Sequence, residues 1–308
     1  MTNLGVIFTA DRPPEELPAF AAAAESAGLD ELWLWEDCFL AGGIAAAATA
    51  LAATERITVG LGVMPAVFRN PVACAMEIAT LARLHPGRFV AGLGHGVPAW
   101  MEQIGALPEK PVRALEETAS TVRRLLAGER VTTAGEYVNV RDVQLEHVPA
   151  EAPPVVLGVR RPLGLRASGR SANGTILAEP AAPAYIRWAR ERIDEGRAAA
   201  GRRDPHRLTV FAKSRIDPDR RHAVEWVAQI LDSESASVQL APVRIGGRLP
   251  GDLADELTVS GTLEQALPSL RGIAAAGVDS IALAPLGPNP DEQLRLLADL
   301  VVPAFRPR

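Results

Sequence analysis

Two adjacent carboxylates and one histidine are the residues of this chain whose types and positions favour chemistry. Glu36 and Asp37 follow directly after the apolar segment Glu31–Trp35, and His95 ends the segment Arg88–His95. Carboxylates and imidazoles exchange protons, and burial raises the pKa of a carboxyl group. We therefore expect Glu36, Asp37 and His95 to act as acid–base groups. Helix capping or pairing with an arginine is the structural alternative for the carboxylates, and a hydrogen-bonded structural role is the alternative for His95.

The segment from Gly158 to Gly164 has the composition of an anion site. It carries Arg160 and Arg161 and places Pro162 where a helix would begin. The first N–H groups of a helix have no partners inside the helix, and the helix dipole adds positive charge at that end. We therefore expect this segment to bind a phosphate group, with Arg160 as the nearest side-chain cation.

Several catalytic motifs are absent from the sequence. There is no GxSxG turn, no Walker A glycine–lysine pair and no HExxH helix, so hydrolase, nucleoside triphosphatase and metalloprotease functions are not indicated. Gly92, Gly94 and Gly96 do not complete a GxGxxG dinucleotide motif, because Val97 stands where the third glycine is needed. The two cysteines lack metal-ligand spacing, and we expect no metal site.

The elements that must position these residues alternate along the chain. Eight short apolar segments are separated by helical patterns, which is typical of a parallel α/β protein and favours a (β/α)₈ TIM barrel with loop insertions. The predicted strands are Leu4–Thr9, Glu31–Trp35, Ile57–Val63, Arg88–His95, Pro154–Val159, Gly174–Glu179, Leu208–Ile216 and Val278–Ala284. We expect one domain over residues 1–308, with insertions at Arg130–Val140 and Ser237–Thr258. The carboxyl ends of barrel strands carry active sites, so the candidate residues should meet there.

Composition narrows the range of partners. The chain has 308 residues, 48% of them hydrophobic, and a net charge of −5. A protein with a net negative charge has no overall positive potential of the kind that nucleic-acid binding usually requires, so we expect no nucleic-acid partner. No apolar run reaches the roughly 20 residues of a membrane span, and the start of the chain lacks a basic secretory pattern. We therefore expect a cytoplasmic protein that acts on a small molecule and has no membrane partner.

Several stretches in order make the chain similar to a known family. They are DELWLWED at 30–37, GRFVAGLG at 87–94, HGVPAWMEQIG at 95–105, PPVVLGV at 153–159 and GRSANG at 169–174. The chain resembles the bacterial luciferase-like flavin and deazaflavin oxidoreductases. Within them it resembles the branch that uses coenzyme F420, akin to methylenetetrahydromethanopterin reductase.

The resemblance implies a TIM barrel that binds F420 or FMN at the strand ends and moves a hydride between the ring and a substrate. It also implies a cis peptide bond between Gly62 and Val63, and a homodimer. By position, the implied cofactor-binding residues are Asp37, Gly62, Val63, Met64, His95, Gly96, Gly158, Val159, Arg160, Leu163 and Gly164.

Two departures from the family pattern bear on the substrate. Cys38 stands where relatives often carry histidine, and Val97 stands where sugar-phosphate dehydrogenases carry a glutamate proton donor, so we do not expect a sugar-phosphate dehydrogenase. Bulky apolar residues near the rim suggest a hydrophobic substrate pocket, with simple packing as the alternative; they are Trp35, Met64, Phe68, Val97 and Trp100. Two other functions stay open: an FMN-dependent monooxygenase supplied by a flavin reductase, and a non-catalytic ligand-binding barrel.

Overall fold

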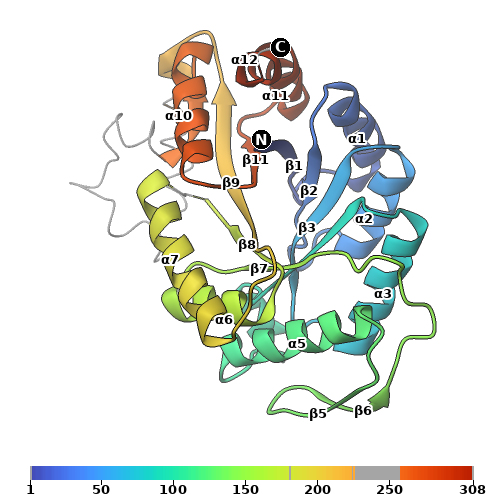
Figure 1. Cartoon of the computed structure of the whole chain (residues 1–308). Helices are drawn as coiled ribbons and strands as arrows, with labels where there is room; N and C mark the ends of the chain where they lie inside the picture. The colour runs from blue at the N-terminus through green and yellow to red at the C-terminus, as the bar shows by residue number, and fades with distance from the viewer. Residues whose placement is uncertain (1, 180–181, 224, 226–256, 307–308) are drawn as a thin grey trace.

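The computed structural model describes residues 2–179, 182–223, 225 and 257–306. Within these residues, eight parallel strands form a closed barrel that helices surround (Figure 1). The strands follow chain order around the barrel, and pairing of the last with the first closes it. They are β1 (Asn3–Phe8), β2 (Glu31–Leu34), β3 (Thr58–Pro65), β4 (Phe89–Gly94), β7 (Val155–Gly158), β8 (Gly174–Leu177), β9 (Arg207–Ile216) and β11 (Ser280–Pro285). Each overlaps one predicted segment, so the predicted (β/α)₈ barrel is confirmed.

Helices cover the outside of the barrel between successive strands (Figure 1). They are α1 (Leu17–Ser26), α2 (Gly43–Ala52), α3 (Pro71–Leu84), α4 (Pro98–Gln103), α5 (Pro111–Leu126), α6 (Pro162–Ser171), α7 (Pro183–Ala199), α10 (Leu263–Ala275), α11 (Pro290–Leu296) and α12 (Val302–Phe305), with short turns at Pro14–Glu16 and Leu297–Val301. Proline begins many of these helices, where its missing N–H costs nothing. The predicted capping box opens α10, since the Gln265 side chain accepts a hydrogen bond from the Thr262 amide at 3.1 Å.

The first predicted insertion forms a hairpin outside the barrel. β5 (Val131–Ala134) and β6 (Asn139–Val143) pair antiparallel. The Glu117 carboxylate of α5 accepts hydrogen bonds from the amides of residues 136–138 and so fastens the hairpin to that helix. Most of the second predicted insertion, Ser237–Thr258, lies outside the described residues. A short strand that the sequence did not indicate, β10 (Val259–Gly261), pairs with the end of β9.

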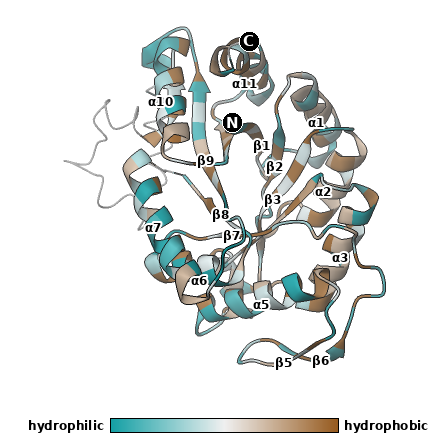
Figure 2. Cartoon of the chain, in the orientation of Figure 1, coloured by the Kyte–Doolittle hydropathy of each residue, from teal (hydrophilic) through white to brown (hydrophobic). Residues whose placement is uncertain are grey.

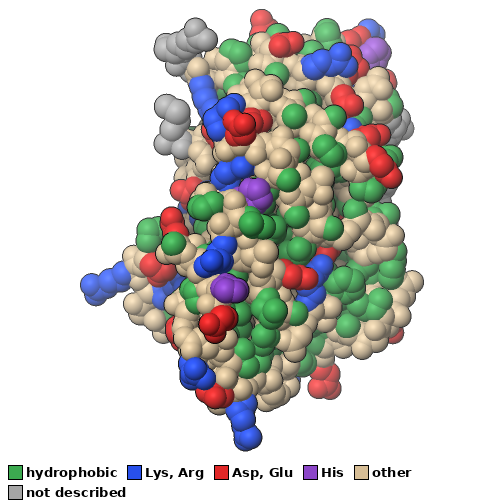
Figure 3. Space-filling view, turned by 90° about the vertical axis from the view of Figure 1, so that its right-hand side faces the viewer, with side chains coloured by type: hydrophobic (Ala, Val, Ile, Leu, Met, Phe, Trp, Pro, Cys, Tyr) green, Lys and Arg blue, Asp and Glu red, His purple; other side chains and the backbone are tan. Residues whose placement is uncertain are grey.

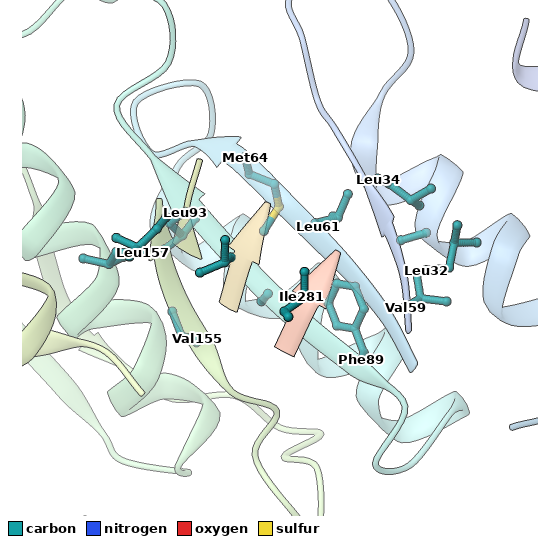
Figure 4. Packing of buried hydrophobic residues seen from close by; sticks show 14 of the residues in the cluster. Leu32, Leu34, Val59, Leu61, Met64, Phe89, Leu93, Val155, Leu157 and Ile281 are labelled. Atoms are coloured by element: carbon teal, nitrogen blue, oxygen red, sulfur yellow. The ribbon is translucent and has the colours of Figure 1, made fainter. Parts of the chain in front are cut away.

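Two apolar layers hold the barrel together. The larger layer packs the outward faces of the strands against the helices, and Figure 4 shows Leu61, Met64, Leu93 and Leu157 within it. The smaller layer fills the barrel interior with Ile7, Trp33, Val90, Val156, Ile176, Phe211, Ala282 and Ala284. Side chains alternate between the two faces of a strand, so neighbouring residues enter different layers. Figure 2 shows the resulting hydrophobic strands beside the mostly hydrophilic α7.

Two aromatic rings dominate the interior layer. Trp33 and Phe211 meet edge to face, with ring centroids 5.2 Å apart. Gly62 of β3 lies directly against them, because a Cβ atom there would come within 2.6 Å of Phe211 Cζ. Glycine is therefore required at this point of β3, and the backbone of β3 approaches the interior rings closely.

The outer surface carries charges of both signs. Figure 3 views the side on which α1, α2 and α3 lie, where acidic and basic side chains are interspersed with hydrophobic ones. Among the helices that the structure describes, none combines the length and hydrophobicity that a membrane span needs.

Candidate active site

The predicted site residues lie at one end of the barrel. Val63 and Gly158 stand near the carboxyl ends of β3 and β7, Asp37 follows β2, and His95 follows β4 directly. Parallel strands of a closed barrel direct all their carboxyl ends to the same face, which is where active sites of this fold are built. The arrangement thus brings together, on one face, side chains that are far apart in the sequence.

A cis peptide bond joins Gly62 to Val63, as the family resemblance implied. The pairing of β3 with β4 shifts register between Leu61 and Met64 at the same place. Met64 consequently points outward into the core, where it is 1% exposed (Figure 4). The expectation that Met64 lines a hydrophobic substrate pocket is therefore wrong, because the irregularity in β3 turns its side chain toward the helices. Its contact with the cofactor stays a prediction.

Val63 lies in a cradle of glycines. Its side chain contacts Gly94 at the end of β4 and Gly158 at the end of β7, and a Cβ atom on Gly158 would come within 2.7 Å of Val63 Cγ1. Val63 itself packs on the interior layer. Gly94 and Gly158 themselves carry no side chain that could cover Val63. A flat ring can therefore approach this part of the backbone.

His95 lies beside the start of α6. Its Nε2 atom is 3.9 Å from the position that a Cβ on Gly164 would take. Its Nδ1 atom is buried and has no hydrogen-bond partner among the described residues. Burial lowers the pKa of His95, and the Pro111 carbonyl opposes this only in part. A half-buried imidazole with a ring nitrogen that no described residue pairs is suited to hydrogen-bond a ligand.

The start of α6 has the geometry expected of an anion site. No described side chain caps this helix, so its first amides are available to a ligand. The Arg160 guanidinium donates to the Glu179 carbonyl and lies 5.7 Å from the centre of the Tyr185 ring. The Tyr185 hydroxyl donates to the Arg160 carbonyl at 2.8 Å. These contacts fix the Arg160 side chain against Glu179 and Tyr185, one residue before the N-cap Arg161 of α6. Leu163 on this turn is exposed, whereas Val159 is buried and packs against Gly164.

Asp37 lines a cavity of about 1060 Å³ beside the ends of β1, β2, β9 and β11. Burial raises the pKa of Asp37, and the negative charges of Asp11 and Glu179 raise it further. Trp35 and Lys213 line the same cavity, and Lys213 Nζ lies 3.4 Å from Glu179 Oε1. Sequence reasoning missed Lys213 and Glu179. The available signals were one of the two lysines of the sequence inside a predicted strand and a carboxylate at the end of another.

Glu36 does not line this cavity, although it precedes Asp37. Its carboxylate accepts hydrogen bonds from the Arg69 guanidinium, at 2.6 Å from Nη1 to Oε2, and from the Gly43 amide at 2.8 Å. The side chain is buried within these contacts, at 6% exposure. The expected acid–base role of Glu36 is therefore replaced by a structural one. It caps the start of α2 and ties that helix to the loop before α3.

Fold and site together define a (β/α)₈ barrel with a ligand site at the carboxyl ends of its strands. The family model described as luciferase-like monooxygenase matches residues 2–280. The chain belongs to this family.

Named relatives span nearly the whole chain. The 5,10-methylenetetrahydromethanopterin reductase of Archaeoglobus fulgidus is 26% identical, with 99% of this chain and 100% of that protein covered. The F420-dependent glucose-6-phosphate dehydrogenase of Intrasporangium calvum is 33% identical, with 79% of each chain covered. The solved coenzyme F420-dependent tetrahydromethanopterin reductase from Methanopyrus kandleri has a TM-score of 0.84 at 21% identity, covering 99% of both chains. This last likeness supports the fold.

Proposed function

We propose that this protein is an oxidoreductase that binds F420 at the barrel mouth and moves a hydride between it and an organic substrate. The observation that carries the proposal is the glycine cradle around Val63. The start of α6, which has no side-chain cap, and a His95 nitrogen without a partner in the described part of the chain lie at the same face. A relative that is 33% identical is named an F420-dependent dehydrogenase, which supports the choice of cofactor.

The residues present fit such a cofactor. Val63, with Gly94 and Gly158 beside it, offers a flat support for a ring. The amides at the start of α6 and the guanidinium of Arg160 would bind its phosphate. When bound, F420 supplies a carbon atom that accepts or donates a hydride, because it has carbon where a flavin has its reactive nitrogen. Asp37 and His95 would hydrogen-bond the ring or exchange protons beside it.

A second candidate is an FMN-dependent monooxygenase that receives reduced flavin from a reductase partner. The description of the matching family favours it. The α6 turn favours F420, because the lactyl-oligoglutamate tail of F420 carries more negative charge past the phosphate than FMN does. A cytoplasmic location and a homodimer belong to the same proposal, and light scattering would test the dimer.

Titration of the purified protein with F420 and with FMN, followed by fluorescence, tests the proposal. We expect F420 to bind at micromolar concentration and FMN to bind more weakly. FMN binding without F420 binding would favour the monooxygenase. Failure of both to bind would favour a barrel without redox chemistry.

A further inference from the structure

Lys213 is a buried cation whose position calls for an explanation. It lies on β9, is 6% exposed, and lines the cavity that also contains Asp37 and Trp35. Burying an ammonium group costs several kcal/mol unless a partner compensates it. Such groups in a cavity are candidates for a functional role.

The alternation of strand residues directs Lys213 into the barrel mouth. Phe211, two residues earlier on β9, belongs to the interior layer, and residues two apart on a strand share a face. The same rule relates two other cavity residues to the interior layer, since each follows an interior residue by two positions: Thr9 and Trp35. Lys213 therefore belongs to the next layer toward the mouth.

This layer lies next to the proposed ring support. The ring of Phe211 is so close to Gly62 that a Cβ there would clash with it, and Gly62 forms the cis peptide bond with Val63. Lys213 lies two residues nearer the carboxyl end of β9 than Phe211 and on the same face, whereas Val63 extends from β3. A ring supported by Val63 would thus have Lys213 on the far side of the same mouth.

The surroundings of Lys213 are those of a proton-exchanging group. Glu179 provides a carboxylate 3.4 Å away, and Asp37 and Asp11 add negative charge on the other side of the cavity. Two other positions near the barrel mouth, 97 and 36, do not supply a proton donor. Val97 carries no ionisable group, and the carboxylate of Glu36 is bound to Arg69.

We propose that Lys213 is a catalytic residue whose ammonium group exchanges a proton with the substrate. The proton goes to or comes from the substrate oxygen or nitrogen whose charge changes during hydride transfer. This inference rests on the proposed F420 function. The inference also defines the substrate class. The substrate is a carbonyl compound or an imine in the reducing direction, and the matching alcohol or amine in the oxidising direction.

The step balances in atoms and electrons. In the reducing direction, the substrate carbon gains a hydride, whose two electrons come from reduced F420. The π electron pair of the C=O or C=N bond moves to the oxygen or nitrogen, which takes a proton from Lys213 Nζ. The resulting neutral amine regains a proton from solvent, which takes up the proton that reduced F420 releases as it returns to its oxidised form. The reverse sequence oxidises the alcohol or amine.

The sequence offers a direct test, because Lys213 and Lys110 are its two lysines. Protein labelled with ¹³C at lysine Cε gives one NMR signal for each, and K110R assigns them. Lys110 pairs with Glu136 at the surface and serves as the internal control. We expect added F420 to shift the Lys213 signal and to leave the Lys110 signal in place.

Variants test the chemistry. K213M and K213R should bind F420 within threefold of wild type, and each should lose at least about 100-fold in kcat on a ketone or imine that the wild type reduces. F420 binding with an unmoved Lys213 signal, or wild-type kcat in both variants, would overturn this inference alone. Absence of F420 binding to the wild type would overturn the proposed function, and this inference with it.

Discussion

At the scale of single residues, His95 shows how burial prepares a side chain for a ligand. Its Nδ1 atom is buried without a partner among the described residues, and burial lowers its pKa. Leaving a buried polar atom unpaired costs free energy, which a bound ligand would recover.

We expect His95→Ala to lower turnover by about 100-fold or more, because removal of an acid–base or hydrogen-bonding group has effects of that size. His147→Ala, at an exposed histidine, is the matched control and should keep wild-type turnover. The measurements are kcat and circular dichroism of both variants. Equal turnover in His95→Ala and wild type would remove the chemical role of His95.

Asp37 makes stability depend on pH. Burial and the neighbouring carboxylates raise the pKa of Asp37 in the folded state, so the folded protein binds this proton more tightly than the unfolded chain does. The stability that follows is present at low pH and is lost as pH rises through the raised pKa. Asp37→Asn should therefore unfold at a higher temperature than wild type near pH 7, and the difference should shrink at low pH.

Thermal unfolding at several pH values checks this prediction. Asp299→Asn, at an exposed position, is the control and should show no such pH-dependent gain. A Tm for Asp37→Asn that falls below wild type near pH 7 would mean that the fold stabilises the Asp37 carboxylate, which is the opposite of what a raised pKa requires. Lower turnover in the same variant would show that the carboxylate is kept for function.

Glu36 differs from its neighbour because its buried carboxylate already has partners. Removing one partner of a buried ion pair typically costs about 3–5 kcal/mol, so Glu36→Gln should lower the free energy of unfolding strongly. Its affinity for F420 should stay near wild type, since the carboxylate does not line the cavity. Urea unfolding and an F420 titration measure the two effects. If Glu36→Gln keeps wild-type stability but loses turnover, Glu36 has an acid–base role after all.

At the scale of elements, the start of α6 is where backbone geometry determines binding. Pro162 begins the helix, and Arg160, two residues before it, contacts Glu179 and Tyr185. Arg166, farther along the same helix, instead pairs with Glu195 of α7 at 2.7 Å. Both side chains of this ion pair are partly exposed, so Arg166 lies on the solvent side of α6.

We expect Arg160→Ala to weaken F420 binding by about 1.5–3 kcal/mol, the range for hydrogen bonds to charged groups. Arg166→Ala is the control and should leave the dissociation constant nearly unchanged. Titrations at low and moderate salt compare the two variants. Equal losses of F420 affinity in the two variants would mean that positive charge acts on the cofactor at long range without a specific contact. A wild-type dissociation constant for Arg160→Ala would mean that the phosphate binds elsewhere.

At the scale of the whole molecule, closure of the barrel brings residues from both halves of the chain to one face. Val63 and His95 come from the first half, and Gly158, Glu179 and Lys213 come from the second. A ligand that bridges them binds the folded state and not the unfolded chain. Such binding must raise the stability of the fold.

F420 should accordingly raise the unfolding temperature. At a free concentration 100 times the dissociation constant, binding adds about 2.7 kcal/mol of stability. FMN at the same concentration should raise the temperature less, and calorimetry with each cofactor measures the difference. No rise with F420 under these conditions would contradict its binding to the folded protein.

The amino-acid sequence was sufficient to predict the architecture and the face that carries the site. Apolar periodicity and helix boundary signals depend on local physics, so eight strands, their helices and the hairpin were predictable. Family resemblance added the cis bond between Gly62 and Val63, which the structure contains. The location of Asp37 and His95 after strands β2 and β4 followed from the same pattern.

Which neighbouring residues face the ligand depends on contacts that form when the barrel closes. Glu36 binds Arg69, whereas Asp37 lines the cavity. Met64 points outward because the register of β3 shifts beside it. Lys213 reaches the mouth because Phe211 below it faces the barrel interior. Strand side chains alternate with a period of two, and one irregularity reverses the pattern. Their partners come from distant segments, which no local sequence pattern can bring into contact.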